Sequence, residues 1–166
     1  MKILLLQVEV NPGKPDTYGT TPLSRAARGG YEAVVKLLLE GGEVNLDKPD
    51  GCGTTPLSHA AWGGYEGVVK LLLERDEVNP DKPDNYGTTP LSHAAWGGPE
   101  AVVKLLLARD EVNPDEPANR GQTPLHNAAR IGHKQIVKIL LDQDEVNPDN
   151  PDNWGDTALV CRLGWA

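Results

Sequence analysis

The sequence predicts an all-α solenoid in which helix-turn-helix pairs stack and β-hairpin-like loops project between them. Three observations predict it: the chain matches itself when shifted by 34 residues, each copy carries two short helical patterns, and a segment rich in Pro, Asp and Asn separates the copies. Isolated helices this short are marginal in water. Each pair must therefore bury its apolar face against its neighbours, as in a repeat array.

The repeat divides the chain into a single array. The stretch TTPLSHAAWGG begins at Thr54 and again at Thr88, and the two units that contain it differ at only six positions. Because the segment Lys2 to Leu5 matches Lys36 to Leu39, we expect the chain to open inside a helix. The expected parts are a half repeat at 1–8, complete units at 9–42, 43–76, 77–110 and 111–144, and a partial unit at 145–166.

The first helix of each unit is predicted to begin at a Thr-Pro pair. The Thr hydroxyl can accept hydrogen bonds from free backbone N–H groups, and Pro has a helical φ and no N–H to leave unpaired. In the third complete unit the helix should run from Pro90 to Gly97-Gly98, since glycine accepts the left-handed conformation that ends a helix. The pair recurs at Thr21, Thr55, Thr89 and Thr123, and decays to Thr157-Ala158.

The second helix of each unit is predicted to be amphipathic. In the third unit its apolar residues are Val102, Val103 and 105–107, and Glu100 lies near its positive end. The following EVNPDKPDNYG-type segment is too rich in Pro, Asp, Asn and Gly for a helix and predicts an extended two-armed loop. The expected core residues are Leu23, Ala26, Ala27, Val34, Leu38 and their equivalents at the repeat spacing.

Composition limits the kinds of partner. A net charge of -8 and a pI of about 4.9 argue against nucleic acid, because that affinity comes mainly from Lys and Arg neutralising phosphates. No apolar run approaches the roughly 18 residues that a membrane helix needs, so no membrane partner is expected. Two cysteines are too few for a disulfide framework, which favours a reducing, cytoplasmic location.

The motif GTTPLSHAAWGG, followed by VVKLLL and EVN, resembles the ankyrin repeat. The shared features are a TPLH-type helix start, an Ala-Ala pair, a Gly before the second helix and a hairpin after the VN. The period is 34 residues where the family usually has about 33, and Ser24, Ser58 and Ser92 stand where it usually has His. The hairpin spelling is most similar to fungal ankyrin arrays, which are often attached to larger receptor-like proteins.

Paired positions on the first helices predict a binding surface. Residues three apart share one helix face, and the Ala-Ala pair takes the face that packs closely, so these pairs point elsewhere. The pairs are Arg25 and Arg28, His59 and Trp62, His93 and Trp96, and Asn127 and Arg130. The ankyrin resemblance implies that they face a concave groove beside the hairpins, together with the hairpin-tip residues. Those tip residues are Tyr18, Cys52, Tyr86, Arg120 and Trp154.

The groove positions concentrate residues that are typical of binding hot spots. Three of the four Trp and two of the four Tyr fall on them, and interfaces are enriched in Trp, Tyr and Arg. We expect a non-catalytic scaffold that binds another protein through this groove. Arginines at both ends and tryptophans in the middle predict a partner segment with acidic ends and an apolar middle. The expected contact residues are Tyr18, Arg25, Arg28, His59, Trp62, Tyr86, His93, Trp96, Arg120, Arg130 and Trp154.

Other interpretations of these residues stay open. The Trp rings could pack over the hairpins as a lid on the core, and the arginines could be scattered solvated charges. A small-molecule or enzymatic groove using the His59/Trp62 and His93/Trp96 cluster would need an enclosed cavity of roughly 300 Å³ or more.

The array could also be a piece of a longer one, for instance of a receptor-like protein. Its uncovered ends would then contact missing neighbours or a second copy of the chain. The apolar residues at these ends are Leu4, Leu5, Leu159 and Trp165.

No catalytic, cofactor or metal site is predicted. His59 and His93 belong to adjacent stacked helices about 8–10 Å apart, too far to share a zinc ion with ligands at about 2.1 Å. Cys52 follows Asp47 and Asp50, whereas reactive thiols need an electropositive setting. The hairpin carboxylates lack the EF-hand spacing and are interpreted as turn formers and solubility charges.

Overall fold

The computed structural model describes residues 13–41 and 44–160. Within these ranges it contains eight helices and one isolated β-bridge, between Pro151 and Thr157. The all-α prediction is confirmed. The helix expected at 2–5 and the last six residues lie outside the described ranges. The helices are α1 Pro22–Arg28, α2 Glu32–Glu40, α3 Pro56–Gly63, α4 Glu66–Leu73, α5 Pro90–Gly97, α6 Glu100–Leu107, α7 Pro124–Ile131 and α8 Lys134–Leu141.

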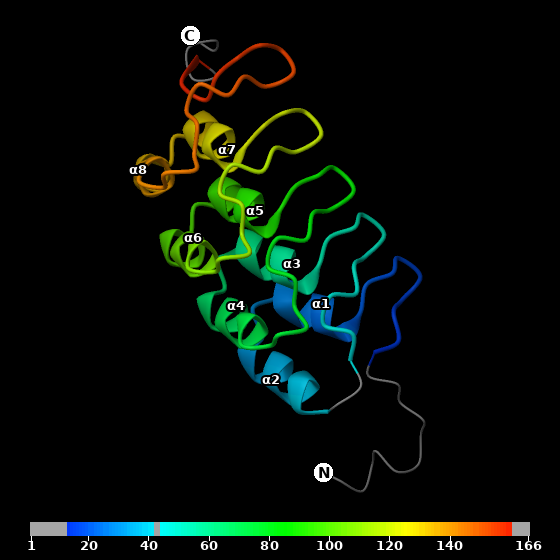
Figure 1. The fold of residues 1–166 in the computed structure, drawn as a ribbon. Coiled ribbons are helices and arrows are strands. Elements are labelled where there is room, and N and C mark those ends of the chain that lie inside the picture. Colours follow the sequence, from blue (N-terminus) through cyan, green and yellow to red (C-terminus); the bar gives the residue numbers. More distant parts are fainter. Residues whose placement is uncertain (1–12, 42–43, 161–166) are drawn as a thin grey trace, which may run out of the picture.

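The helices form two rows that run along the stack (Figure 1). The first helices α1, α3, α5 and α7 pack on one another in sequence, the second helices α2, α4, α6 and α8 do the same, and the two helices of each unit also pack together. The loops between units all project to the same side, beside the row of first helices. Each unit is thus stabilised mainly by its nearest neighbours, as in a solenoid.

The predicted helix caps are present. Thr55 Oγ1 accepts a hydrogen bond from the Ser58 backbone N–H at 3.1 Å, and equivalent bonds cap α1 and α5. At α7 the residue three positions later is His126, whose Nδ1 lies 3.3 Å from the Thr123 backbone nitrogen. The first helices end as expected: Gly98 has φ 88° after α5, a conformation that glycine adopts without strain.

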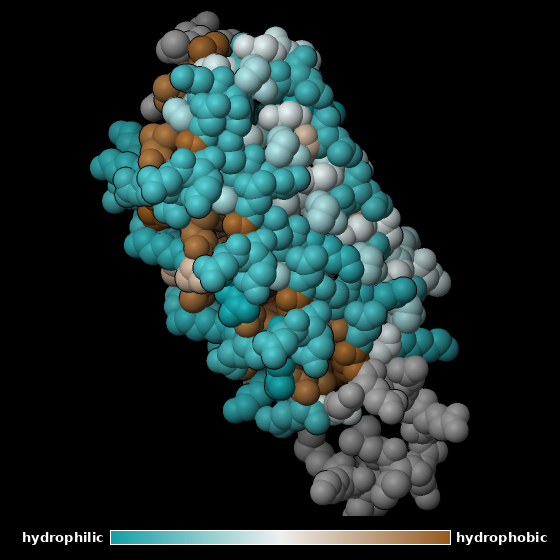
Figure 2. All heavy atoms as spheres, viewed as in Figure 1, coloured by the Kyte–Doolittle hydropathy of each residue, from teal (hydrophilic) through white to brown (hydrophobic). Residues whose placement is uncertain are grey.

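The core is aliphatic and lies between the two rows. Leu57, Leu91 and the Ala-Ala pairs are buried throughout the stack. One predicted core residue is wrong: Val34 is 45% exposed, whereas the equivalent Val68 is 1% exposed. Val68 lies on α4, which packs on α2, the preceding member of the row of second helices, whereas α2 is the first described helix of that row. In Figure 2 apolar atoms show in the seams between the second helices and around α2 on an otherwise hydrophilic face.

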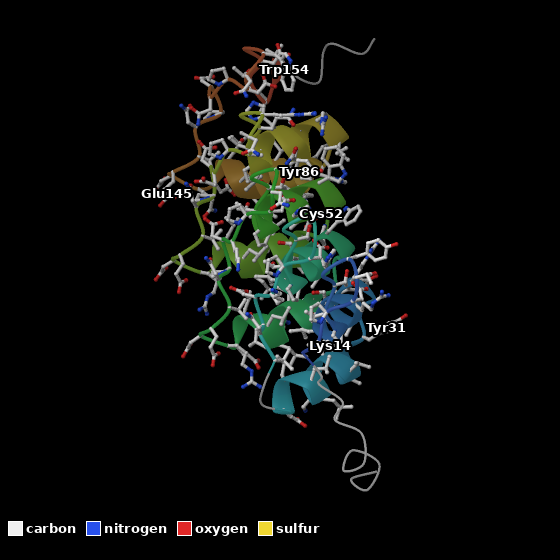
Figure 3. The ribbon with its side chains drawn as sticks, turned by 90° about the vertical axis from the view of Figure 1, so that its right-hand side faces the viewer. Lys14, Tyr31, Cys52, Tyr86, Glu145 and Trp154 are labelled. Carbon is white, nitrogen blue, oxygen red and sulfur yellow. The ribbon has the colours of Figure 1, made fainter. Side chains whose placement is uncertain are left out.

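The hairpins are held in register by hydrogen bonds between consecutive loops. The backbone N–H of Asn85 donates to the Cys52 carbonyl at 3.0 Å, and that of Asn119 donates to the Tyr86 carbonyl at 2.9 Å. Side-chain amides of Asn85 and Asn119 add bonds to the preceding hairpin. Because every tip bonds to the one before it, the tip residues follow one another along the stack, as Cys52, Tyr86 and Trp154 do in Figure 3.

Candidate functional site

The structure separates the predicted contact residues into an exposed set and a set that binds the protein's own hairpins. On the first helices, Trp62 is 52% exposed and Trp96 is 39% exposed, so neither ring is sealed beneath a loop. The other exposed members are Tyr18, Arg28, Tyr86, Arg120, Arg130 and Trp154. These side chains are free to meet a partner.

His59, His93 and Arg25 instead point back to the hairpin of their own unit. His59 is only 7% exposed, and its Nε2 lies 3.0 Å from Asp50 Oδ2. The equivalent His93–Asp84 distance is 3.2 Å. Arg25 remains exposed but pairs with Asp16 at 2.5 Å. The His59 ring is thus buried against its own hairpin, and a partner contact at His59 stays a prediction.

Burial sets the protonation of the two histidines. Desolvation lowers the pKa of both His59 and His93, although the neighbouring carboxylates act in the opposite direction. The rings are therefore neutral at physiological pH, with the Nε2–H donating to Asp50 or Asp84. In the first unit, the hydrogen bond from Arg25 lowers the pKa of Asp16.

The same aspartates shape the hairpins. Asp50 Oδ1 accepts hydrogen bonds from the backbone N–H groups of Cys52 at 2.9 Å and Thr54 at 3.0 Å. The arrangement recurs at Asp16, Asp84 and Asp152. The interpretation of hairpin carboxylates as turn formers is thus confirmed for Asp50, Asp84 and Asp152. One oxygen closes the turn, and in the units of His59 and His93 the other reaches the helix.

The fourth unit departs from this pattern. Ala118 stands where the other hairpins have Asp, and Asn127 stands where the second and third units have His. A cavity of about 370 Å³ lies at this place, between the groove face of α5 and the fourth hairpin. Its lining residues include Trp62, Ser92, His93, Trp96, Ala118, Gln122, Asn127 and Arg130. The volume is sufficient for a small ligand, but the half-exposed Trp side chains leave it open to solvent.

Aromatic and cationic side chains meet along this cavity. The Arg130 guanidinium lies 4.2 Å from the centre of the Trp96 ring, within the range of a cation–π contact. The Trp62 and His93 rings have centroids 6.5 Å apart. The cavity therefore combines apolar walls with a positive charge.

A second hollow lies at the other end of the groove. It has a volume of about 1220 Å³ and is bordered by Tyr18, Arg25, Arg28 and Cys52. Cys52 is a free, exposed thiol. Because Arg25 is paired with Asp16, Arg28 and Lys48 are the cations bordering this hollow that form no ion pair within the described residues.

Within 13–41 and 44–160, no three His, Cys, Asp or Glu side chains come close enough together to hold a metal ion. None of the helices in these ranges has the length and hydropathy to span a bilayer.

Comparison with known families agrees with the fold. A family model described as ankyrin repeats (3 copies) matches residues 44–116 and 103–161, and the single ankyrin repeat model matches residues 18–50. A search of curated proteins finds no match to the chain. Ankyrin repeats are generally protein–protein interaction modules, and proteins built from them are typically non-catalytic scaffolds. Since these matches run through most of the sequence, the chain belongs to the ankyrin repeat family.

Proposed function

We propose that this chain is a non-catalytic scaffold that binds a protein partner in the groove between its first helices and its hairpin tips. The observation that carries the proposal is the exposure of Trp62 and Trp96, which occupy the same position on two consecutive stacked helices. Exposed Trp residues backed by a rigid scaffold are typical of binding hot spots. A preformed groove also loses little conformational entropy when a partner binds.

The charges of the groove favour a partner segment with acidic ends and an apolar middle. Arg28 lies at one end, Arg120 and Arg130 lie at the other, and the two Trp side chains lie between them. Apolar side chains of the partner would bury the Trp rings, while carboxylates would pair with the arginines. We further propose a reducing, cytoplasmic location, with which the free thiol of Cys52 is compatible.

A selection from a peptide library displayed on phage tests the groove. We expect peptides selected on the natural chain to carry apolar residues flanked by Asp or Glu. The Trp62→Ala/Trp96→Ala variant should bind them at least about tenfold more weakly, a loss of about 1.4 kcal/mol. As a matched control, Ile131→Ala/Leu141→Ala removes two exposed apolar side chains that belong to neither the groove nor the end faces. Unchanged affinity in the Trp variant would overturn the proposal.

The ends of the array supply a second candidate contact. Val34 and Leu37 of α2 are exposed at one end, and Leu159 and Val160 are exposed at the other. We propose that these faces meet neighbouring repeats or a second copy of the chain. Light scattering over a concentration series should then show a rising average mass, and Leu37→Asp should reduce that rise; a constant monomer mass would contradict self-association.

A further inference from the structure

The fourth hairpin lacks the acceptor that the other hairpins use. At Asp16, Asp50, Asp84 and Asp152 a carboxylate oxygen accepts hydrogen bonds from the backbone N–H groups two and four residues later. Ala118 has no such oxygen. As a result, the N–H groups of Arg120 and Gln122 have no acceptor among the described residues. These two N–H groups occupy the positions that donate to the Asp carboxylate in the other hairpins.

The side chain opposite this turn is also unpaired. Asn127 takes the position from which His59 and His93 reach their Asp partners, and its amide makes no hydrogen bond within the described part of the chain. Ser92 is fully buried on the wall of the same cavity, and its Oγ has no hydrogen-bond partner there. By contrast, the equivalent Ser58 Oγ lies 3.0 Å from Thr55 Oγ1.

The cavity of about 370 Å³ is lined by Ser92, Gln122 and Asn127, which carry three of these unpaired groups. Ala118 lines it as well, and so do Trp62 and Trp96. No described carboxylate forms an ion pair with Arg120 or Arg130. The cavity and the fourth hairpin beside it thus combine backbone and amide donors, positive charge and apolar walls. A carboxylate is the group that this combination suits, since charge-assisted hydrogen bonds are the strongest that neutral donors make.

We propose that the fourth hairpin binds an aspartate or glutamate side chain of the partner, which supplies the carboxylate that Ala118 lacks. One oxygen accepts from the N–H groups of Arg120 and Gln122, as Asp50 Oδ1 accepts from its own turn. The other oxygen faces the Asn127 amide, as Asp50 Oδ2 faces His59. The Trp rings cover the aliphatic part of the ligand. This inference rests on the proposed groove and specifies one contact within it.

The site should distinguish a carboxylate from its neutral amide isostere. A glutamine side chain that places its oxygen against the two N–H groups must turn its NH₂ group toward Asn127 and the arginines. It offers no charge to Arg130, and its NH₂ group faces other donors without an acceptor. A preference for Glu over Gln of about tenfold or more is therefore expected.

Amide chemical shifts in the ¹⁵N-labelled full chain test the proposal directly. The probe is a capped tripeptide with Glu between two Leu residues, compared with the same peptide carrying Gln. We expect the Glu peptide to shift the amide protons of Arg120 and Gln122 downfield in a saturable way, and the Gln peptide to do so at least about tenfold more weakly. In Ala118→Asp, which introduces the residue that the other hairpins carry, both responses should disappear.

Three results would overturn the inference. They are equal responses to the Glu and Gln peptides, a Glu response that persists in Ala118→Asp, and an acetate response as strong as that of the peptide, which would indicate a site for small free carboxylates. Ala118→Asp leaves Trp62 and Trp96 in place. If phage-selected peptides bind that variant normally but fail to bind the Trp variant, the carboxylate site is wrong and the groove stands. If the Trp variant also binds normally, the groove itself is wrong.

Discussion

Nε2 of His93 lies 3.2 Å from Oδ2 of Asp84, and this contact joins helix α5 to the hairpin that precedes it. The same carboxyl group accepts the backbone N–H groups of Tyr86 and Thr88 through its other oxygen. One residue therefore fixes both the turn and its position over the helix. The position of the hairpin tip, and with it Tyr86, depends on this carboxylate.

Removing the carboxylate should loosen the third hairpin. Asp84→Ala leaves the N–H groups of Tyr86 and Thr88 and the His93 ring without their acceptor, which should lower the free energy of unfolding by about 1–3 kcal/mol. Asp84→Asn is the matched control, because its amide oxygen can still accept from the backbone. Urea unfolding of both variants measures the difference. Equal stability of Asp84→Ala and the natural chain would show that the contact contributes nothing.

Stability should fall on mild acidification because of the buried histidines. Burial lowers the pKa of His59 and His93 below the ordinary value of 6.5. Between 6.5 and the lower pKa of the folded state, the unfolded chain binds more protons than the folded chain. The free energy of unfolding therefore decreases as the pH falls through this window, and it levels off below the pKa of the folded state. His59→Asn/His93→Asn, which copies Asn127, should have a flatter profile. Urea titrations at a series of pH values measure both.

The difference between the pH profiles of the natural chain and the His59→Asn/His93→Asn variant reports on the two histidines alone. Burial raises the pKa of Asp47, Asp81 and Asp115, so these groups favour the folded state as pH falls, with the opposite sign. Their contribution is common to both proteins and cancels in the difference. Parallel profiles would contradict the assignment to His59 and His93.

The helix ends could be predicted because the signals that set them are local. The Thr-Pro start and the glycine stop of α5 each depend on a few neighbouring residues. The contact between Asp84 and His93 depends on the hairpin folding back over the helix, and residue spacing on a helix face does not reveal that geometry. A signal was nevertheless present: Asp recurs nine residues before Arg25, His59 and His93, and both partners change together at Ala118 and Asn127.

Two serines in nearly identical units should respond differently to truncation. Ser58 Oγ lies 3.0 Å from Thr55 Oγ1, so Ser58→Ala removes a buried hydrogen bond between two hydroxyl groups and should cost about 1 kcal/mol. Ser92 Oγ has no partner within the described ranges, so Ser92→Ala should be neutral or slightly stabilising. Urea midpoints of the two single variants decide the matter. A larger loss in Ser92→Ala than in Ser58→Ala would contradict it.

Removing the two groove tryptophans should leave the fold intact. Both side chains are substantially exposed, and the cation–π contact between Trp96 and Arg130 is worth about 0.5–1 kcal/mol at such a site. We expect Trp62→Ala/Trp96→Ala to lose less than about 2 kcal/mol of stability in total. Thermal unfolding followed by circular dichroism measures the loss. Loss of a cooperative unfolding transition would show that the Trp rings cover the core. A loss of binding in this variant could not then be assigned to the groove.

The position of a unit in the stack should decide how much its valines contribute. Val34 and Val68 are equivalent residues in consecutive units, but Val34 is 45% exposed and Val68 is 1% exposed. Since full burial of a Val side chain is worth about 1.5–3 kcal/mol, Val68→Ala should lower the free energy of unfolding by more than about 1 kcal/mol, and Val34→Ala should lower it by clearly less. The two variants remove the same atoms from the same helix position. A larger loss of stability in Val68→Ala than in Val34→Ala therefore measures the burial that α2 gives to α4. Equal losses would contradict the difference in burial between the two valines.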